Sequence, residues 1–226
     1  MPTVFIISAP SGSGKSTLVN VVRRTVPDLE FSISYTTRKP RGSEKNGCEY
    51  FFISREHFEE MIRQDEFLEH AKVFEYDYYG TAKRFLNKAA ADSKDLLLDI
   101  DVQGAQQIKA KLPEAVSVFI LPPNRAELER RLRERSQDSE EVIQKRLKAA
   151  GREIENYWKY DYILVNDRLE DSVATLNAIL LSERLRRNGR SDASLSARAD
   201  SCRLEQIRER IQPILRSFGD TAASGQ

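Results

Sequence analysis

The chain has 226 residues, of which 40% are hydrophobic, so it is long enough to bury a sizeable core. Its 36 basic and 35 acidic side chains nearly cancel, which excludes a global field that would draw the protein onto nucleic acid or an anionic membrane. The two cysteines lack metal-ligand spacing and suit a reducing compartment, and the N-terminus lacks the pattern of a signal peptide. We therefore expect a cytoplasmic protein with neither nucleic-acid nor membrane partners.

Strand and helix patterns alternate along most of the chain. Continuous apolar runs, which are typical of strands buried in a parallel sheet, occur at 3–9, 96–100, 116–121 and 162–165. Helical spacing of apolar residues occurs at 15–26, 102–111, 124–135, 139–158 and 169–187. This alternation predicts an α/β fold in which helices cover both faces of a parallel sheet.

Three stretches depart from this rhythm. Residues 32–85 are rich in Tyr and Phe and contain short strand-like pieces and one helix near 55–64, for which Ser54 is a suitable N-cap. They predict an inserted α+β lobe. Residues 124–150 are dense in Arg and Glu at helical spacing. Beyond residue 187 a polar, small-residue stretch predicts a linker, and the amphipathic helix that follows should be kinked by its proline.

The stretch "APSGSGKST" (9–17) lies between a buried strand and a helix, which is the context of a phosphate-binding loop. Gly12 and Gly14 let the backbone turn its N–H groups inward, and the helix N-terminus adds positive potential. Lys15 would reach the β- and γ-phosphates, and the Ser16 hydroxyl would bind Mg²⁺. An alanine replaces the first glycine of the usual pattern. The residues expected to contact the triphosphate are Ser11, Gly12, Ser13, Gly14, Lys15, Ser16 and Thr17.

A second element supports this interpretation. The run "LLLDID" (96–101) ends in two acids, where a carboxylate could hold Mg²⁺ through water. An ordinary polar strand end would show the same pattern. The run therefore indicates a metal ligand only because the chain also has a phosphate loop. A phosphate loop alone does not define a reaction. Because the chain lacks the N-K-x-D motif with which GTPases read guanine, a GTPase is not expected.

The stretch "SISYTTRKPR" (32–41) predicts a strand that runs into a basic loop. Its two arginines, Arg38 and Arg41, could each give parallel N–H bonds to two phosphate oxygens. A solvated basic loop is the alternative interpretation of the same pattern.

Taken together, several stretches resemble the guanylate kinase family in their order along about residues 2–187. They are "SAPSGSGKSTL", "SISYTTRKPRGSEKNGCEYFF", "FLEHAKVF…YYGT", "LLLDIDVQGAQQI", "FILPP", "LERRLRERSQDSEEVIQKRL" and "YDYILVND". The resemblance implies transfer of the γ-phosphoryl group of ATP to GMP or dGMP with Mg²⁺, in purine nucleotide metabolism. ATP and GMP would then be the partners of the chain.

The resemblance also implies a domain plan. A P-loop core with a parallel sheet in three layers would comprise 1–31, 86–123 and 151–187 of a kinase domain at 1–187. A GMP-binding lobe would comprise 32–85, and a helical lid would comprise 124–150. Residues 188–226 would form a C-terminal extension, which we expect to be either a packing helix or a dimerisation helix that makes a homo-oligomer.

For the acceptor phosphate, the resemblance assigns Arg38, Arg41, Tyr50 and the tyrosine that precedes the glycine of "YYG". Because "FEYDYYG" is one residue longer than the usual spacing, Tyr79 is the expected ligand and Tyr78 is the alternative.

For the base, Glu69 can accept hydrogen bonds from both N1–H and N2–H₂ of guanine, whereas adenine offers an acceptor at N1. The resemblance adds Ser34, Thr81 and Asp101 to the base site. Asp99 is then expected to bind the metal through water, although the two aspartates could share these roles.

For catalysis, the resemblance assigns Lys15 and Arg41 together with two lid arginines, Arg135 and Arg146; Arg131 is a further candidate. A surface helix with paired Arg and Glu would show the same pattern. The GMP phosphate is already a nucleophile at neutral pH, so no general base is required and catalysis is positioning and electrostatics. Asn166 and Asp167 correspond to contacts on the adenine side.

Two other functions are compatible with part of this pattern. A related P-loop kinase for another small phosphate acceptor would share the core. A non-catalytic guanylate-kinase-like scaffold module would bind peptides instead, and such modules degrade the phosphate loop and the lid. Lys15, Ser16, Arg135 and Arg146 are all present, which favours the enzyme.

Overall fold

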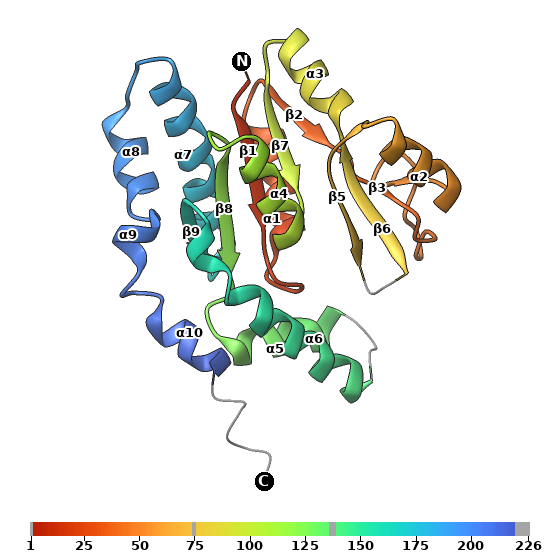
Figure 1. The fold of residues 1–226 in the computed structure, drawn as a ribbon. Helices are drawn as coiled ribbons and strands as arrows, with labels where there is room; N and C mark the ends of the chain where they lie inside the picture. Colours follow the sequence, from red (N-terminus) through yellow and green to blue (C-terminus); the bar gives the residue numbers. More distant parts are fainter. Residues whose placement is uncertain (1, 74–75, 136–138, 220–226) are drawn as a thin grey trace. The chain divides into compact units, whose positions relative to one another are not determined.

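The computed structural model describes residues 2–73, 76–135 and 139–219 (Figure 1). The chain forms two compact units, Met1–Ile6 with Pro27–Val116 and Ile7–Val26 with Ser117–Gln226. The division into a core, a lobe at 32–85 and a lid at 124–150 is a different partition of the chain and stays a prediction.

In the first unit a parallel sheet has the strand order β2-β7-β1, and β1 continues into the second unit. These strands are β1 (Val4–Ser8), β2 (Leu29–Ser32) and β7 (Asp95–Asp99). The three leucines 96–98 of β7 are fully buried, as their unbroken apolar run predicts. The Asp95 carboxylate accepts a hydrogen bond of 2.9 Å from the backbone N–H of Thr3. The strands predicted at 3–9 and 96–100 are therefore confirmed.

A second sheet of the first unit has the strand order β4-β3-β6-β5. Its strands are β3 (Tyr35–Thr36), β4 (Phe51–Phe52), β5 (Phe67–Val73) and β6 (Asp77–Ala82), and the helices of this unit are α2 (Arg55–Arg63), α3 (Lys83–Ala91) and α4 (Val102–Lys111). The Ser54 hydroxyl accepts from the backbone N–H of His57 at 3.2 Å, so the predicted N-cap of α2 is confirmed. Phe58 of α2 stacks on Phe67 and Tyr78, which fixes the helix against the sheet.

The second unit continues from β1 with the strand order β1-β8-β9. Its elements up to residue 187 are α1 (Lys15–Thr25), β8 (Val116–Leu121), α5 (Arg125–Arg135), α6 (Glu140–Ile154), a 3₁₀ turn (Tyr157–Lys159), β9 (Tyr162–Val165) and α7 (Leu169–Arg187). Strands β8 and β9 pair in parallel. The α/β fold with a parallel central sheet is therefore confirmed. None of the helices in the described ranges has the length and apolarity that crossing a membrane requires.

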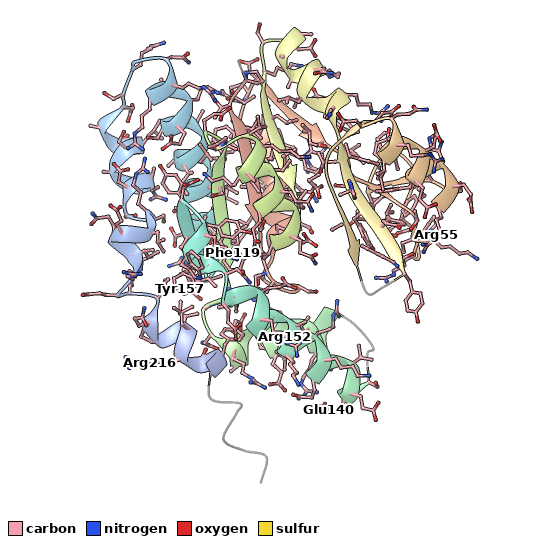
Figure 2. All side chains as sticks on the ribbon, in the orientation of Figure 1. Arg55, Phe119, Glu140, Arg152, Tyr157 and Arg216 are labelled. Carbon is pink, nitrogen blue, oxygen red and sulfur yellow. The ribbon has the colours of Figure 1, made fainter. Side chains whose placement is uncertain are left out.

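Helices α5 and α6 carry many charged side chains (Figure 2). Arg133 of α5 pairs with Glu129 of the same helix and with Glu140, which opens α6. Ile143 and Leu147 of α6 are buried. The Arg/Glu pattern thus forms exposed pairs on one face while apolar residues pack on the other.

The predicted linker after residue 187 is wrong, because helix α8 (Ala193–Asp200) lies there. The Asp192 carboxylate caps this helix by accepting from the backbone N–H groups of Ser194 and Leu195, both at 2.9 Å. The single kinked helix is also wrong. The segment forms α9 (Leu204–Ile207) and α10 (Gln212–Gly219), and Pro213 lies in the first turn of α10, where its missing N–H breaks no helical bond.

The C-terminal elements cover the open edge of β9. Ile163 of β9 donates its backbone N–H to the carbonyl of Cys202 at 2.8 Å, and Leu204 donates to the carbonyl of Asp161 at 3.2 Å. An unpaired edge of a sheet is a site of aggregation, so this segment protects it. Further along, the Ser217 hydroxyl accepts from the backbone N–H of Arg125 at 3.1 Å, which ties α10 to the start of α5.

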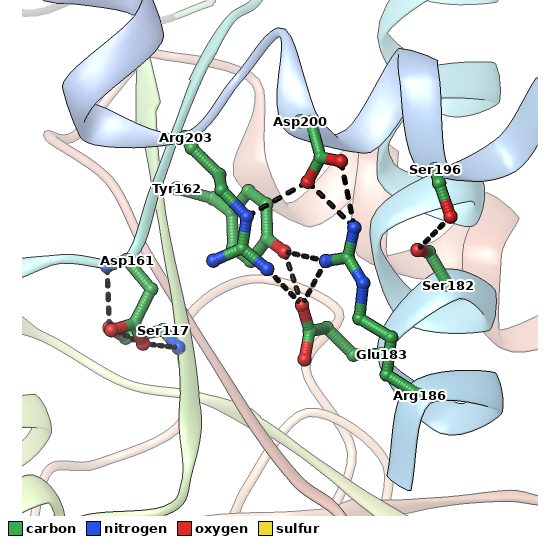
Figure 3. Close-up of polar contacts among 9 residues, drawn as sticks. All are labelled: Ser117, Asp161, Tyr162, Ser182, Glu183, Arg186, Ser196, Asp200 and Arg203. Atoms are coloured by element: carbon green, nitrogen blue, oxygen red, sulfur yellow. Dashed lines mark hydrogen bonds and ion pairs between the residues drawn. The ribbon is translucent and has the colours of Figure 1, made fainter. Parts of the chain in front are cut away.

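A network of ionic hydrogen bonds holds the C-terminal segment to α7 (Figure 3). Glu183 accepts from the Tyr162 hydroxyl and, at 2.8 Å in each case, from Arg186 and Arg203. Asp200 accepts two bonds from Arg186, at 2.7 and 2.8 Å, and one from Arg203. Burial and the bond to Glu183 raise the pKa of Tyr162, so it stays a neutral donor. The network joins three segments that are distant in the sequence.

Substitution Glu183→Gln should lower the free energy of unfolding by about 1–3 kcal/mol, because the half-buried guanidiniums of Arg186 and Arg203 each lose a negatively charged partner. Urea denaturation followed by circular dichroism measures this change. The control is Glu205→Gln on the exposed face of α9, which should change the free energy by less than about 0.5 kcal/mol. Equal effects of the two variants would contradict a stabilising role of the network.

Candidate functional site

The loop between β1 and α1 has the geometry of an anion cradle. Gly12 and Gly14 adopt φ angles of 92° and 87°, which L-residues with a side chain rarely adopt. A Cβ at Gly14 would lie 2.3 Å from Asn166 Nδ2, and one at Gly12 would lie 2.8 Å from a methyl group of Leu132. The loop therefore requires glycine at both positions, for backbone conformation and for space.

Lys15 and Ser16 form the first turn of α1, directly after Gly14. Backbone N–H groups at a helix start are not used within the helix, so they can bind an anion. Ser16 and Thr17 are exposed. The Ser13 hydroxyl is buried and has no hydrogen-bond partner within the described ranges.

Asn166, which follows β9, holds the phosphate loop in place. Its side-chain amide donates to the carbonyl of Ser13 at 2.7 Å, and the side chain is buried. Its own carbonyl accepts a bond of 3.0 Å from Arg131, which also pairs with Glu127. Asn166 therefore acts on the loop backbone in this structure, and its predicted contact with adenine stays a prediction, as does that of the exposed Asp167.

The two helices predicted as a lid contact the phosphate loop within the second unit. Arg146 of α6 donates to the Ser11 hydroxyl at 3.2 Å. Leu128 and Leu132 of α5 pack over Gly12. The side chain of Arg135 lies outside the described part of the chain. Of the predicted lid arginines, the structure thus brings Arg146 to the loop directly and Arg131 to the residue that supports it.

In the first unit, Arg38 lies at the centre of a polar cluster. Its guanidinium donates two parallel bonds to Glu44, at 2.9 and 3.0 Å, and Nε donates to the Tyr79 hydroxyl at 3.1 Å. The Tyr50 ring lies 5.3 Å from the guanidinium carbon. The bond between Arg38 and Glu44 raises the pKa of the arginine and lowers that of the glutamate, so both stay charged.

Between the two candidate tyrosines, only Tyr79 lies at Arg38. The Tyr78 ring stacks on Phe58 with a centroid distance of 5.1 Å and lies under the guanidinium of Arg55, which is labelled in Figure 2. Successive side chains of a strand point to opposite faces of the sheet, so β6 can present only one of the pair to the cluster.

Arg41 is exposed, and its backbone N–H donates to Glu44 at 2.7 Å. The Glu44 carboxylate therefore accepts from both arginines of the basic loop. Arg38 donates with its guanidinium, and Arg41 donates with its backbone N–H. Sequence reasoning missed this residue. The available signal was the spacing R-x-x-R-x-x-E, which places an acid within reach of both arginines in a tight loop.

Glu69 of β5 is buried, with 4% of its surface exposed. One carboxylate oxygen accepts from the Thr81 hydroxyl at 2.7 Å, since Glu69 and Thr81 are cross-strand neighbours. Burial raises the pKa of Glu69 to about 7, and the nearby charge of Asp101 acts in the same direction. A Cβ at Gly104 of α4 would lie 2.7 Å from the other oxygen, so the first turn of that helix passes very close to the carboxylate.

Asp101 caps α4 by accepting from the backbone N–H of Gly104 at 2.9 Å, which places it beside Glu69. Asp99 is half-buried at the end of β7. Ser34 is half-buried, and its carbonyl accepts from the backbone N–H of Phe51. The structure thus brings together Glu69, Thr81 and Asp101 as one acidic site of the first unit.

Comparison with known proteins identifies relatives of the chain. A sequence model of the family described as guanylate kinase matches residues 1–183. The chain is 57% identical to a guanylate kinase of Koribacter versatilis over 225 residues, 96% of each chain. It is 49% identical to a guanylate kinase of Escherichia coli, over 86% of this chain and 96% of the relative.

Among solved structures, the crystal structure of guanylate kinase from Anaplasma phagocytophilum is similar, with a TM-score of 0.68 and 32% identity. The match covers 81% of this chain and 87% of that one. The phosphate loop, the arginine cluster and the buried acidic site therefore occur in a chain that belongs to the guanylate kinase family.

Proposed function

We propose that this protein transfers the γ-phosphoryl group of ATP to GMP, giving ADP and GDP. The observation that carries the proposal is a pair of sites in the first unit with complementary chemistry. The buried Glu69 and Thr81, with the exposed Asp101 beside them, form an acceptor for a base that has adjacent N–H donors. Arg38 and Tyr79 form a donor cluster for a phosphate. GMP carries both groups.

Glu69 would distinguish guanine from adenine. An ionised carboxylate accepts from guanine N1–H and N2–H₂ together, whereas adenine would place a lone pair against the buried charge. The Thr81 hydroxyl already occupies one lone pair of the carboxylate and fixes its orientation. Asp101, whose second oxygen is not used for the helix cap, would accept from the 2-amino group. Ser34 would complete the base site.

The acceptor phosphate would bind between the hydroxyls of Tyr50 and Tyr79 and the guanidiniums of Arg38 and Arg41. Because two N–H groups of Arg38 are bonded to Glu44, only part of its donors are left for a phosphate. The guanidinium of the exposed Arg41 would supply the other pair of N–H bonds to the phosphate. Such a clamp would neutralise the charge of the GMP phosphate while one of its oxygens attacks the γ-phosphorus of ATP and ADP leaves.

ATP would bind with its β- and γ-phosphates in the loop of the second unit, where Lys15 and the N-terminus of α1 supply positive charge. Mg²⁺ prefers oxygen ligands and commonly takes one or two from protein beside those of the phosphates. The Ser16 hydroxyl of the same loop has the donor chemistry for this ion, which would neutralise charge on the phosphates. Asp99 of the first unit stays the predicted ligand through water. The lid arginines, Arg146 and Arg135, would stabilise the transferring phosphoryl group.

The two competing functions have less support. A kinase for another acceptor would not require a buried carboxylate for a base with adjacent donors. A peptide-binding scaffold module would not require Lys15, Ser16 and a lid arginine bonded to the phosphate loop. We extend the proposal to dGMP and to a cytoplasmic role in purine nucleotide metabolism. A homo-oligomer through the C-terminal segment stays a prediction, and the packing of that segment on its own β9 favours the packing-helix alternative.

Substitution Lys15→Ala should lower the turnover number at least about 100-fold, because it removes a charge that the transition state needs. The affinity for GMP should stay close to that of the unchanged protein, since Lys15 belongs to the ATP loop. ADP release measures the turnover, and calorimetry measures GMP binding. Parallel loss of turnover and of GMP affinity would contradict the separation of the two sites.

Substitution Arg41→Met should raise the KM for GMP and lower the rate, because a guanidinium fork is lost from the phosphate clamp. Steady-state kinetics with GMP as the varied substrate measure both constants. Arg63→Met, which removes an exposed arginine of α2, is the control and should leave them within about twofold. Unchanged kinetics of the Arg41 variant would remove this residue from the site.

The raised pKa of Glu69 predicts a pH dependence. Below about pH 7 the carboxyl is mostly protonated and cannot accept from both guanine donors, so the KM for GMP should fall as the pH rises from 6 to 8. The GMP phosphate itself titrates near pH 6. The variant Glu69→Gln isolates the contribution of the carboxyl, because it keeps the phosphate titration.

In Glu69→Gln the fall of KM near pH 7 should disappear, and the preference for GMP over AMP should drop by about 100-fold or more. Steady-state kinetics with each monophosphate, between pH 6 and 8, provide the test. A variant that keeps both the preference and the pH profile of the unchanged protein would contradict the role of Glu69 in reading the base.

A further inference from the structure

Gln107 of α4 makes a pair of hydrogen bonds to the backbone beside Glu69. Its side-chain carbonyl accepts from the N–H of His70 at 3.3 Å, and its side-chain N–H₂ donates to the carbonyl of His70 at 2.8 Å. One amide side chain thus satisfies both backbone groups of the residue that follows Glu69, much as a neighbouring strand would.

These bonds matter because β5 is the last strand of its sheet, next to β6. The outer backbone groups of an edge strand have no strand to pair with. Lys111 of α4 donates to the carbonyl of Leu68 at 2.5 Å, at the point where the register of β5 is irregular, so two residues of α4 bond to the backbone of this strand. Helix α4 takes the place of the missing strand over the segment that contains Glu69.

The same face of α4 determines how closely the helix approaches the carboxylate. Gly104, Gln107 and Lys111 follow at intervals of three and four residues and so form one stripe of the helix. A Cβ at Gly104 would lie 2.7 Å from Glu69 Oε2 and 3.0 Å from its carboxyl carbon. Gly104 leaves room for the Glu69 carboxylate, and Gln107 and Lys111 bond β5 to the helix.

Helix α4 also carries the second acid of the site, because Asp101 is its N-cap. The carboxylate of Asp101 is thus fixed to the start of the helix, and that of Glu69 is fixed to its side. The distance between the two acids depends on how α4 and β5 are joined.

We infer that Gln107 is a positioning residue for guanine selectivity, and that Gly104 allows the close approach that this positioning needs. The inference rests on the proposed function, in which Glu69 reads the base. Hydrogen-bonded recognition requires placement within about 0.5 Å, and a misplacement of about 1 Å can cost about 100-fold in rate. Without Gln107, the edge strand loses two of the bonds that fix the depth and tilt of the Glu69 carboxylate.

The test compares two variants with a matched control on the same helix. Gln107→Met keeps the length of the side chain and removes both bonds to His70. Gly104→Ala adds the Cβ that would press on Glu69, while alanine favours a helix interior more than glycine does. A loss of selectivity in Gly104→Ala therefore cannot be attributed to a weaker helix. The control is Gln106→Met at the exposed neighbouring position.

The measured quantity is kcat/KM for GMP divided by kcat/KM for IMP, which keeps N1–H of the base but lacks the 2-amino group. We expect Gln107→Met and Gly104→Ala to raise the KM for GMP about 10-fold or more and to lower this ratio about 10-fold. The KM for ATP should stay within about twofold, and Gln106→Met should match the unchanged protein. Thermal melting shows whether each variant is folded.

In folded Gln107→Met and its control, any of three results would overturn the inference. The first is an unchanged ratio in a folded Gln107→Met, even if Gly104→Ala loses selectivity. The second is an equal rise of KM for GMP and ATP. The third is the same loss in Gln106→Met. If Gln107→Met does not fold, an unchanged ratio in Gly104→Ala overturns it. Loss of selectivity in Glu69→Gln, with none in these variants, would remove this inference alone. Absence of GMP turnover in the unchanged protein would remove the proposed function.

Discussion

A carboxylate held away from water is the constraint on which the account of this protein depends. Glu69 is buried at the edge of a small sheet. One of its oxygens accepts from the Thr81 hydroxyl, and the other lies so near Gly104 of α4 that a Cβ on this residue would collide with it. A charge in that position is costly unless further donors reach it, which is why its pKa is raised to about 7. In the proposed function, a base with two adjacent N–H donors would supply what the site lacks. Its binding would offset the electrostatic cost of burying the charge, and a base without those donors would leave that cost in place.

The polar cluster around Arg38 in the same unit is built in the opposite way. Arg38 is already paired with Glu44, so its charge is satisfied before any ligand arrives. Such a pair holds the guanidinium in one orientation and moderates the positive potential of the loop. In the second unit, preorganisation is carried by backbone conformation and by Asn166, which bonds to the loop itself. The chain thus prepares one site by desolvation, one by ion pairing and one by backbone geometry.

Much of this could be predicted from the sequence, because the signals were local. The apolar runs at 116–121 and 162–165 and the helical pattern at 169–187 have the bounds that the structure shows. The glycines of the phosphate loop and the N-cap Ser54 were equally readable. Helix α8 was missed because its small polar composition outweighed the single signal of Asp192 as an N-cap. The amphipathic helix after it was expected, but as one kinked helix and not as the separate helices α9 and α10. Gln107 could not be identified, since its partner His70 lies 37 residues away. Glu44 was missed although its spacing from the two arginines was a usable signal. The choice of Tyr79 over Tyr78 could not be settled from the sequence, because it depends on which face of β6 lies at Arg38.

The most direct measurement of the central claim is the titration of the Glu69 carboxyl itself, by carbon NMR of selectively labelled protein with and without GMP. We expect a pKa near 7 in the free protein and a clearly lower pKa with GMP bound, because the guanine donors stabilise the ionised form. A pKa near the ordinary value of 4.5 in the free protein, or a value that GMP leaves unchanged, would contradict it.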